Sequence, residues 1–262
     1  MLTTRFVTGA PNWLDVGTSD IDGAISFYGG LFGWQFQSAG PDAGGYGFFQ
    51  LSGKTAAGAM QITPEQGTPS WSVYFQTPDA ESTAKSVEQA GGSVLMAPMD
   101  VMGEGHMAMF ADQAGVRFGI WQPARTKGLD VASDPGSLCW VELYTPDVPA
   151  AAGFYHTVFG WETTSVPFPG GTYTCVNPAG TEEGAMFGGL VPLADDPNGA
   201  VGPYWLPYFE VTDTDATVAK AQELGGTVRM DAMDVEGVGR MAKLADPYGA
   251  RFAVIKSAQQ QS

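Results

Sequence analysis

Apolar and polar residues alternate over the first ordered stretch of the chain and then change to a helical period. Residues Asn12 to Thr18 alternate and are rich in strand-forming side chains, which predicts a β-strand. Asp20 is a favourable helix N-cap, and Gly33 can end a helix in the left-handed conformation. Between them the apolar residues follow one stripe of a 3.6-residue period: Ile21, Ile25, Tyr28 and Phe32.

Glycine-rich turns then separate three short β-rich segments. We expect strands at Trp34–Ser38, Tyr46–Leu51 and Ala57–Thr63, which complete a β-α-β-β-β unit. A second unit of the same plan follows. Its predicted elements are a strand at Trp71–Thr77, a helix at Asp79–Ala90, a strand at Ser93–Met96 and a hairpin from His106 to Trp121 that turns at Asp112–Gly115.

Both units occur twice. The segment from Asn12 to Trp34 returns from Cys139 to Trp161 at a constant spacing of 127 residues, so that Tyr28 corresponds to Tyr155. The strand and helix of the second unit return 134 residues later, beginning at Trp205. The chain therefore contains four β-α-β-β-β units in two copies. We expect domains at residues 8–122 and 137–257, joined by a polar surface linker at 123–136.

Composition narrows the possible partners. The 262 residues are 44% hydrophobic, which is enough for a sizeable core, and the formal net charge is −16. So acidic a chain is a poor partner for nucleic acid or an anionic membrane surface. No basic start with an apolar run and no apolar stretch of membrane-spanning length occurs, so we expect a cytoplasmic protein. Cys139 and Cys175 lie on different predicted strands and are expected to be buried free thiols.

The sequence F-Y-x-x-x-F-G-W at the end of each first helix and the turn D-x-x-G in each second hairpin mark this repeat. With these motifs the chain resembles the vicinal oxygen chelate superfamily of glyoxalase I, bleomycin-resistance proteins and extradiol dioxygenases, and in particular its tandem glyoxalase-like or hydroxylase-like members from actinobacteria. The resemblance covers nearly the whole chain. It implies an α+β fold of two tandem glyoxalase-like domains, each a curved mixed sheet with a concave ligand cleft and helices on the convex face.

Strand alternation predicts which side chains face the clefts. Leu14 and Val16 are apolar and should pack against the helix, so Trp13 and Asp15 face the other way. Applied to every copy, this argument gives two aromatic clefts that each hold a carboxylate and an arginine. The remaining candidate ligand-binding residues on the cleft side are Tyr74, Arg117, Trp121, Trp140, Glu142, Tyr144, Tyr208, Glu210 and Arg251.

The residues that bind metal in relatives are replaced in this chain. The position of the first ligand, seven residues before the capping aspartate, holds Trp13 and Trp140. The second position holds Ser72 and Leu206, and the position of the final glutamate holds Gly119 and Ala253. A divalent site needs three or four nitrogen, oxygen or sulfur ligands. We therefore expect no metal and no cofactor.

Three residues are candidate general bases: Asp15, Glu142 and His106. The alternative for the two carboxylates is structural, since Arg117 and Arg251 could neutralise them across the sheet. A glycine-rich loop from Met96 pairs Asp100 with His106, and its copy pairs Asp234 with Arg240. These residues either form a rim loop that orients a ligand or a salt-bridged crossover.

Two functions remain open from the sequence. The preferred hypothesis is a metal-free protein that binds a small aromatic metabolite or antibiotic by stacking in clefts lined with Trp, Tyr and Met. The alternative is a lyase, isomerase or natural-product-modifying enzyme that uses one of the three candidate bases. A metal-dependent glyoxalase or dioxygenase is disfavoured by the missing ligands. The partner is a small molecule in each case. Because the tandem copies can pair with each other, we expect a monomer, with a dimer as the alternative.

Overall fold

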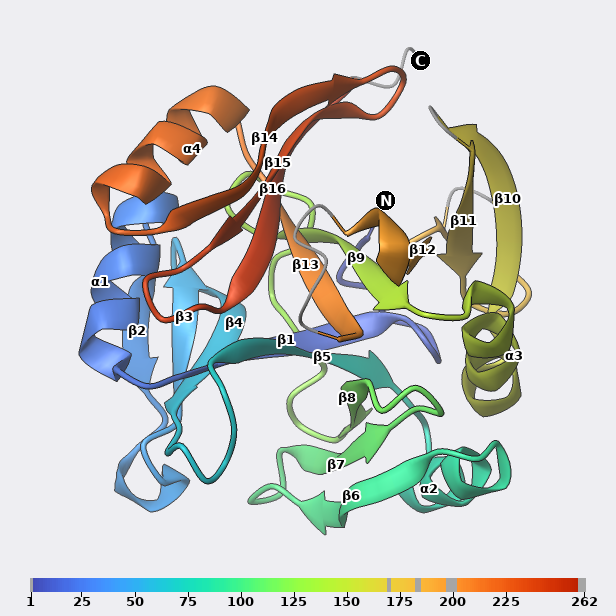
Figure 1. The fold of residues 1–262 in the computed structure, drawn as a ribbon. Coiled ribbons are helices and arrows are strands. Elements are labelled where there is room, and N and C mark those ends of the chain that lie inside the picture. The colour runs from blue at the N-terminus through green and yellow to red at the C-terminus, as the bar shows by residue number, and fades with distance from the viewer. Residues whose placement is uncertain (1, 169–170, 182–184, 197–201, 259–262) are drawn as a thin grey trace. The chain divides into compact units, whose positions relative to one another are not determined.

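Four β-α-β-β-β segments follow one another along the chain (Figure 1). The computed structural model describes residues 2–168, 171–181, 185–196 and 202–258. The first segment comprises β1 (Pro11–Thr18), α1 (Ile21–Phe32), β2 (Gln35–Ser38), β3 (Gly47–Leu51) and β4 (Lys54–Gln61). The second comprises β5 (Ser70–Gln76), α2 (Ala80–Gln89), β6 (Ser93–Asp100), β7 (Gly105–Ala111) and β8 (Arg117–Pro123). The third comprises β9 (Leu138–Thr145), α3 (Val148–Phe159), β10 (Glu162–Phe168), β11 (Gly171–Asn177) and β12 (Gly188–Pro192). The fourth comprises β13 (Tyr204–Glu210), α4 (Thr214–Glu223), β14 (Thr227–Val235), β15 (Gly239–Ala245) and β16 (Arg251–Ser257).

The strands form two eight-stranded mixed sheets with the same order. The first runs β2-β3-β4-β1-β5-β8-β7-β6 and the second β10-β11-β12-β9-β13-β16-β15-β14. In each segment the first strand pairs in parallel with the last, as in β1 with β4 and β13 with β16. The remaining pairs within a segment are antiparallel hairpins, as in β7 with β8. The predicted α+β fold of four repeated segments is confirmed.

One predicted loop is mostly strand. The segment from Met96 that we expected as a glycine-rich loop belongs to β6 as far as Asp100, and the chain re-enters the sheet in β7 at Gly105. The register of this hairpin shifts between Val94 and Met96 and again between Met96 and Met99. Such bulges interrupt the alternation of side chains that sequence analysis uses to recognise a strand. The expectation of a long loop was therefore wrong.

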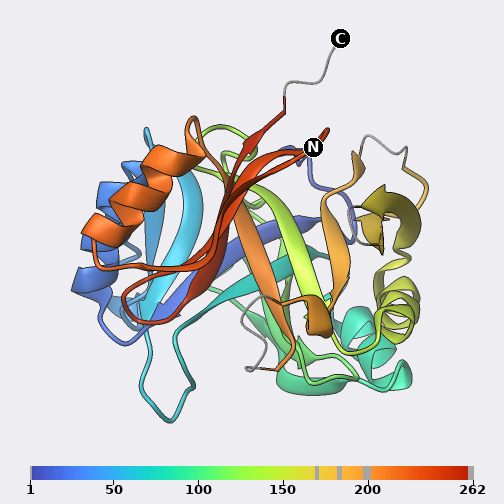
Figure 2. The same cartoon turned by 45° about the horizontal axis from the view of Figure 1, so that its top comes forward.

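The chain folds into two compact units, and each unit combines segments from both copies of the repeat. Unit 1 consists of Met1–Leu14, Ser72–Gly128 and Trp140–Trp205, and thus holds the second and third segments. Unit 2 consists of Asp15–Trp71, Leu129–Cys139 and Leu206–Ser262, and holds the first and fourth. Helices α2 and α3 contact each other in unit 1, and α1 and α4 do so in unit 2, as both views show (Figures 1 and 2).

Each helix begins at an aspartate N-cap. Asp20, Asp79, Asp147 and Asp213 accept a hydrogen bond from the backbone N–H three residues later. Helices α1 and α3 end at Gly33 and Gly160 in the left-handed conformation, as the sequence predicts. The buried face of α1 is shifted from the predicted stripe. It consists of Ala24, Phe27 and Tyr28, whereas Ile21 and Ile25 are half-exposed.

The core of unit 1 is built around Tyr155, whose ring is fully buried. The Tyr155 hydroxyl donates to Oδ2 of Asp112 at 3.2 Å and accepts from Nε1 of Trp205 at 3.3 Å. The ring of Trp161 stacks on Tyr155 with 4.6 Å between centroids. Asp112 also accepts from the backbone N–H of Val116 within its turn. The tyrosine of one motif and the aspartate of the other motif thus meet, and they join the second segment to the third.

Unit 2 repeats this arrangement. The Tyr28 hydroxyl donates to Oδ2 of Asp246 at 3.0 Å and accepts from Nε1 of Trp71 at 3.1 Å. Tyr28 packs edge-on against Trp71 and Phe252. The recurrence of both motifs in the sequence therefore has a structural cause, because each unit needs one tyrosine from an F-Y motif and one aspartate from a D-x-x-G turn.

The segment predicted as a linker packs into unit 2 from residue 129 onwards. Asp130 exchanges hydrogen bonds with the backbone of Thr55, and Leu129 and Val131 are buried. The carbonyl of Gly136 accepts from Nε1 of Trp34 at 2.8 Å. The second tryptophan of the F-G-W motif has the same role in unit 1, where Nε1 of Trp161 donates to the carbonyl of Gly9 at 2.8 Å. These indoles fix the chain segments that precede the two copies.

Within the described residues, none of the helices has the length and apolar character needed to cross a membrane. Cys139 and Cys175 are both buried and free, as the sequence analysis expected. Burial raises the pKa of both thiols, which disfavours their reactive thiolate forms.

Candidate functional site

The clearest polar constellation in unit 1 surrounds Glu142 on β9. Its side chain is 7% exposed, and each carboxylate oxygen accepts a hydrogen bond from a tyrosine hydroxyl. The Tyr173 hydroxyl donates to Oε1 at 2.9 Å and the Tyr144 hydroxyl to Oε2 at 3.1 Å. Nε1 of Trp140 donates in turn to the Tyr173 hydroxyl at 3.0 Å. We call Trp140, Glu142, Tyr144 and Tyr173 the Glu142 cluster.

Strand geometry brings the Glu142 cluster together. Trp140, Glu142 and Tyr144 occupy alternate positions of β9 and therefore share one face of the sheet, as the alternation predicts. Tyr173 comes from β11 and reaches the carboxylate across β12, where Gly189 is the register partner of Glu142. A Cβ on Gly189 would lie 2.0 Å from the Tyr173 hydroxyl. The absence of a side chain at Gly189 thus lets the tyrosine lie over the strand.

Burial and charge keep the tyrosines of the Glu142 cluster protonated. Burial raises the pKa of Tyr173 well above its ordinary value, and the negative charge of Glu142 raises it further. The pKa of Tyr144 is raised by the same two causes in the same order. Both hydroxyls therefore remain hydrogen-bond donors throughout the physiological pH range. The site presents a carboxylate whose two oxygens already hold one phenolic donor each.

Aromatic rings of intermediate exposure border the Glu142 cluster. The ring of Tyr204 stacks on Tyr144 with 5.0 Å between centroids and 11° between planes, and its hydroxyl donates to the buried Asp196 at 3.1 Å. Phe168 packs 5.7 Å from Tyr173 and is 38% exposed. Trp140, Tyr173 and Tyr204 are half-buried. The buried carboxylate thus lies beside ring surface that a ligand can reach.

The first copy of the repeat has the same arrangement of carboxylate, tyrosine and glycine, in unit 2. The Tyr46 hydroxyl donates to Oδ2 of Asp15 at 3.2 Å, and Asp15 is 7% exposed. Gly58 is the register partner of Asp15, and a Cβ there would lie 1.9 Å from the Tyr46 hydroxyl. Carboxylate, tyrosine and glycine therefore recur together. The two tyrosines escaped the sequence analysis, although Tyr46 and Tyr173 keep the 127-residue spacing of the repeat and could have been found by it.

Three further predicted site residues gather in unit 1. The indoles of Trp13 and Trp121 stack with 6.4 Å between centroids, and the ring of Tyr74 covers Gly119. All three aromatic side chains are more than nine-tenths buried. Nε1 of Trp121 donates to the carbonyl of Thr126 at 2.9 Å, which ties the end of β8 to the chain that follows it. These residues form a packed aromatic layer.

The donor set does not fit a metal of the kind the superfamily binds. Tryptophan occupies the first ligand position in both copies, at Trp13 and Trp140. At Gly119, the position that the sequence resemblance assigns to the final glutamate, a Cβ would lie 2.1 Å from the ring of Tyr74, so a side chain there would have to displace this ring. Within the described part of the chain, no three His, Cys, Asp or Glu side chains are grouped so that they could hold a metal ion.

The predicted charge pairs lie on the two outer hairpins. Asp234 and Arg240 are cross-strand partners and form an ion pair at 2.9 Å. Arg240 is also held by Asp215 at 2.7 Å, which joins the hairpin to the start of α4. Asp100 and His106 are likewise cross-strand partners, but Asp100 accepts from the backbone N–H of Gly103. The geometry of Asp234 and Arg240 matches the alternative of a salt-bridged crossover.

Four other predicted residues have the following places. Both carboxylate oxygens of Glu210 accept from Ser257, one from its backbone N–H at 2.9 Å and one from its hydroxyl at 2.5 Å. The carbonyl of the buried Tyr208 accepts from Sγ of Cys139 at 3.3 Å. Arg117 is exposed at the start of β8, and Arg251 is half-buried at the start of β16. Glu210 therefore anchors the end of β16.

A family model and curated relatives both match nearly the whole chain. The family model described as Glyoxalase/Bleomycin resistance protein/Dioxygenase superfamily matches residues 10–120 and 137–254. The chain is 41% identical to the anthracycline biosynthesis protein DauV of Streptomyces sp. strain C5, over 97% of this chain and 95% of that protein. It is 36% identical to the putative glyoxylase CFP32 of Mycobacterium bovis, over 98% of both chains.

Solved structures show the same fold at low sequence identity. A Mn(II)-bound glyoxalase from Novosphingobium aromaticivorans matches with a TM-score of 0.64 and 14% identity, over 98% of this chain and 86% of that one. The 2,3-dioxygenase LapB from Pseudomonas sp. KL28 matches with a TM-score of 0.66 and 14% identity, over 96% and 93%. At this identity the likeness concerns the fold alone.

Proposed function

Given that this chain belongs to the Glyoxalase/Bleomycin resistance protein/Dioxygenase superfamily, we propose that it binds a small aromatic metabolite carrying hydroxyl or carbonyl groups, without a bound metal. The single observation that carries the proposal is the Glu142 cluster. It combines a buried carboxylate, two phenolic donors and half-buried rings, all within unit 1.

The Glu142 cluster and the neighbouring ring of Tyr204 suit such a ligand. Aromatic surfaces stack on Trp140 and Tyr204 by offset or edge contacts, which add about 0.5–1.5 kcal/mol each to the burial of apolar area. A ligand hydroxyl can donate to Glu142 or Tyr144, because a carboxylate oxygen and a phenolic oxygen can each accept more than one hydrogen bond. The fixed tyrosines pre-organise the carboxylate, so little ordering cost remains when the ligand binds.

The relatives support an aromatic natural product as the ligand. DauV is named for anthracycline biosynthesis, and the likeness extends over 95% of its length. Binding without a metal is supported by the donor set, because tryptophan stands at the first ligand position and Gly119 is covered by Tyr74. The same two features argue against a metal-dependent glyoxalase or dioxygenase.

A second function uses the same cluster. In this hypothesis Glu142 is the general base that takes a proton from the substrate, and the Tyr173 hydroxyl is the acid that returns one. The hydrogen bond of 2.9 Å between Tyr173 and Glu142 lets the proton pass from the carboxyl group back to the tyrosine. Asp15, with Tyr46 at 3.2 Å, offers the same chemistry in the first copy. This alternative predicts turnover with a pH dependence that Glu142→Gln abolishes. His106 lies on the outer hairpin, and no hydrogen bond or ion pair found within the described ranges supports it as the base.

The test is a binding titration with 1,8-dihydroxyanthraquinone in buffer containing a metal chelator. We expect saturable binding that Glu142→Gln and Tyr173→Phe each weaken about tenfold, the equivalent of one hydrogen bond. Tyr46→Phe is the matched control from the first copy and should leave this binding unchanged. Equal affinities of all four proteins would contradict the assignment to the Glu142 cluster, and binding that requires an added metal would contradict the metal-free mode.

A further inference from the structure

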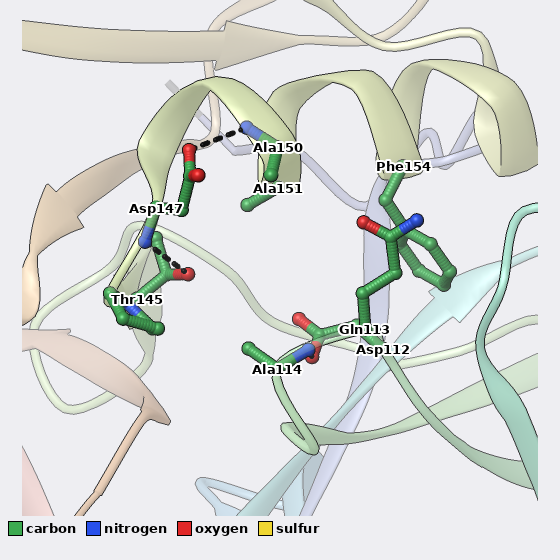
Figure 3. Close-up of a pocket in the computed structure, with 9 residues that line it drawn as sticks. Asp112, Gln113, Ala114, Thr145, Asp147, Ala150, Ala151 and Phe154 are labelled. Carbon is green, nitrogen blue, oxygen red and sulfur yellow. Dashed lines mark hydrogen bonds between the residues drawn. The ribbon is translucent and has the colours of Figure 1, made fainter.

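A pocket of about 180 Å³ lies in unit 1, between the turn that follows β7 and the first two turns of α3 (Figure 3). Its walls are Asp112, Gln113, Ala114, Thr145, Pro146, Asp147, Ala150, Ala151 and Phe154. The close-up shows Ala114 below and Ala150 above, with Phe154 at one side. None of these residues belongs to the Glu142 cluster.

The internal repeat identifies what fills the same place in unit 2. The two turns are equivalent in detail. Oδ1 of Asp112 accepts from the backbone N–H of Ala114 at 2.9 Å, and Oδ1 of Asp246 accepts from that of Tyr248 at 2.9 Å. Tyr248 is therefore the counterpart of Ala114. The loss of a large side chain at Ala114 opens the pocket.

The N-terminus of the facing helix is equivalent as well. The N-cap of α3, Asp147, accepts from the backbone N–H of Ala150 at 2.9 Å, as Asp20 of α1 accepts from that of Gly23 at 3.1 Å. In unit 2 the Tyr248 hydroxyl also donates to Oδ2 of Asp20 at 3.0 Å. In unit 1, Oδ2 of Asp147 has no hydrogen-bond donor among the described residues.

We propose that the unit 1 pocket is a binding site for a small uncharged phenol, which takes the place that the Tyr248 side chain occupies in unit 2. Apolar atoms of Ala114, Ala151 and Phe154 contact the ring, and the hydroxyl donates to Oδ2 of Asp147. Anions are excluded by the carboxylates of Asp112 and Asp147 and by the net charge of −16.

The unit 1 pocket differs in shape from the space that the Tyr248 side chain occupies in unit 2. A Cβ on Gly23 would lie 1.5 Å from the Tyr248 hydroxyl, and the counterpart of Gly23 is Ala150, which carries that Cβ. A phenol in unit 1 must therefore lie displaced from the helix relative to Tyr248. A free ligand can make this shift because, unlike a side chain, it is not tethered to the turn. The volume of about 180 Å³ leaves room for it.

The probe is p-cresol, the side chain of tyrosine, and the readout is backbone amide chemical shifts during a titration. We expect a saturable site at the pocket, reported by shifts at Ala114 and Ala150, with a Kd on the order of 1 mM, which is typical of so small a ligand. The double variant Ala114→Tyr with Ala150→Gly copies unit 2 into unit 1, and should weaken this binding at least tenfold. Tyr248→Ala should create a second site, reported by Gly23.

Tyr173→Phe separates this site from the Glu142 cluster, since it should leave the p-cresol shifts at Ala114 unchanged. The proposal is overturned if the wild-type protein shows no saturable shifts at the pocket. It is equally overturned if the double variant, folded by its amide spectrum, still binds p-cresol there with wild-type affinity. Shifts confined to residues of the Glu142 cluster would assign the ligand to that site instead.

Discussion

The hydroxyl of Tyr155 donates a hydrogen bond of 3.2 Å to Oδ2 of Asp112, and the repeat reproduces the pair as Tyr28 and Asp246 at 3.0 Å. Both members of each pair are buried. Each pair joins a helix from one copy of the repeat to a turn from the other copy. The pairs therefore connect the two segments that make up each unit.

Replacing Tyr155 by phenylalanine should destabilise the protein by about 2 kcal/mol. The change removes a donor from a buried carboxylate and an acceptor from Nε1 of Trp205, and hydrogen bonds to charged groups contribute about 1.5–3 kcal/mol. Urea unfolding measures the effect. Tyr248→Phe is the control, because its bond to Asp20 is open to water and should contribute less than about 1 kcal/mol. Equal losses in both variants would refute the structural importance of the Tyr155 pair.

The stability of the wild-type protein relative to Asp112→Asn should fall as pH rises above about 4. Burial raises the pKa of Asp112 above its unfolded value, so the folded state holds the proton more tightly. The stabilisation that protonated Asp112 contributes is fully present below the pKa of this group in the unfolded chain. It is lost as pH rises through the higher pKa of Asp112 in the folded protein. Urea unfolding from pH 3.5 to 7 measures this difference.

The stability of the wild-type protein relative to Asp20→Asn should change with pH in the opposite direction. The backbone N–H of Gly23 and then the Tyr248 hydroxyl lower the pKa of Asp20, so its stability is present above the unfolded pKa and lost as pH falls. The wild-type protein should therefore gain on this variant as pH rises. Parallel slopes for the Asp112 and Asp20 variants would contradict both assignments.

Gly189→Ala should weaken ligand binding without altering any group that we propose touches the ligand. The new methyl group would overlap the Tyr173 hydroxyl, which lies 2.0 Å from the ideal Cβ position. Tyr173 must then leave Glu142, and affinity for 1,8-dihydroxyanthraquinone should fall about tenfold, as for one lost hydrogen bond. Gly58→Ala makes the same change beside Asp15 in the first copy and is the matched control, which should keep wild-type affinity. Wild-type affinity of Gly189→Ala would show that Tyr173 does not position a ligand-binding carboxylate.

Gly33→Ala should cost about 1 kcal/mol of folding stability. Gly33 ends α1 at φ 72°, a conformation that costs other residues about 1–2 kcal/mol, and no atom lies within 4 Å of a Cβ there, so the cost is one of backbone alone. Gly153, inside α3, has equally open surroundings, and Gly153→Ala should instead stabilise the protein by about 0.5–1 kcal/mol. Thermal unfolding distinguishes the two signs.

Addition of Mn(II), Fe(II), Ni(II) or Zn(II) should leave the melting temperature unchanged. A metal that binds the folded state alone raises stability in proportion to the logarithm of its concentration over Kd. The described residues offer no group of three His, Cys, Asp or Glu side chains for such binding. Metal content of protein purified without chelator provides a second measurement. A stoichiometric metal with an upward shift would overturn the metal-free proposal.

Much of the architecture could be predicted from the sequence because its signals are local or repeated. Asp20 and Gly33 mark the ends of α1, and alternation correctly grouped Trp140, Glu142 and Tyr144 on one face of β9. Alternation failed where bulges interrupt it, so the β6–β7 hairpin was taken for a loop. It also could not place Tyr173, which approaches Glu142 from a strand two positions away in the sheet.

The sequence by itself determined the fourfold repeat and the ends of α1 and α3, because each follows from residue identity at a fixed spacing. Tertiary structure alone decided that each compact unit takes one segment from each copy, with Tyr155 on Asp112 and Tyr28 on Asp246. It also decided that Ala114 leaves a pocket where Tyr248 fills one. The physical reason is that a hydrogen bond or a contact between residues tens or hundreds of positions apart depends on how strands and helices pack, and that packing leaves no periodic signal in the chain.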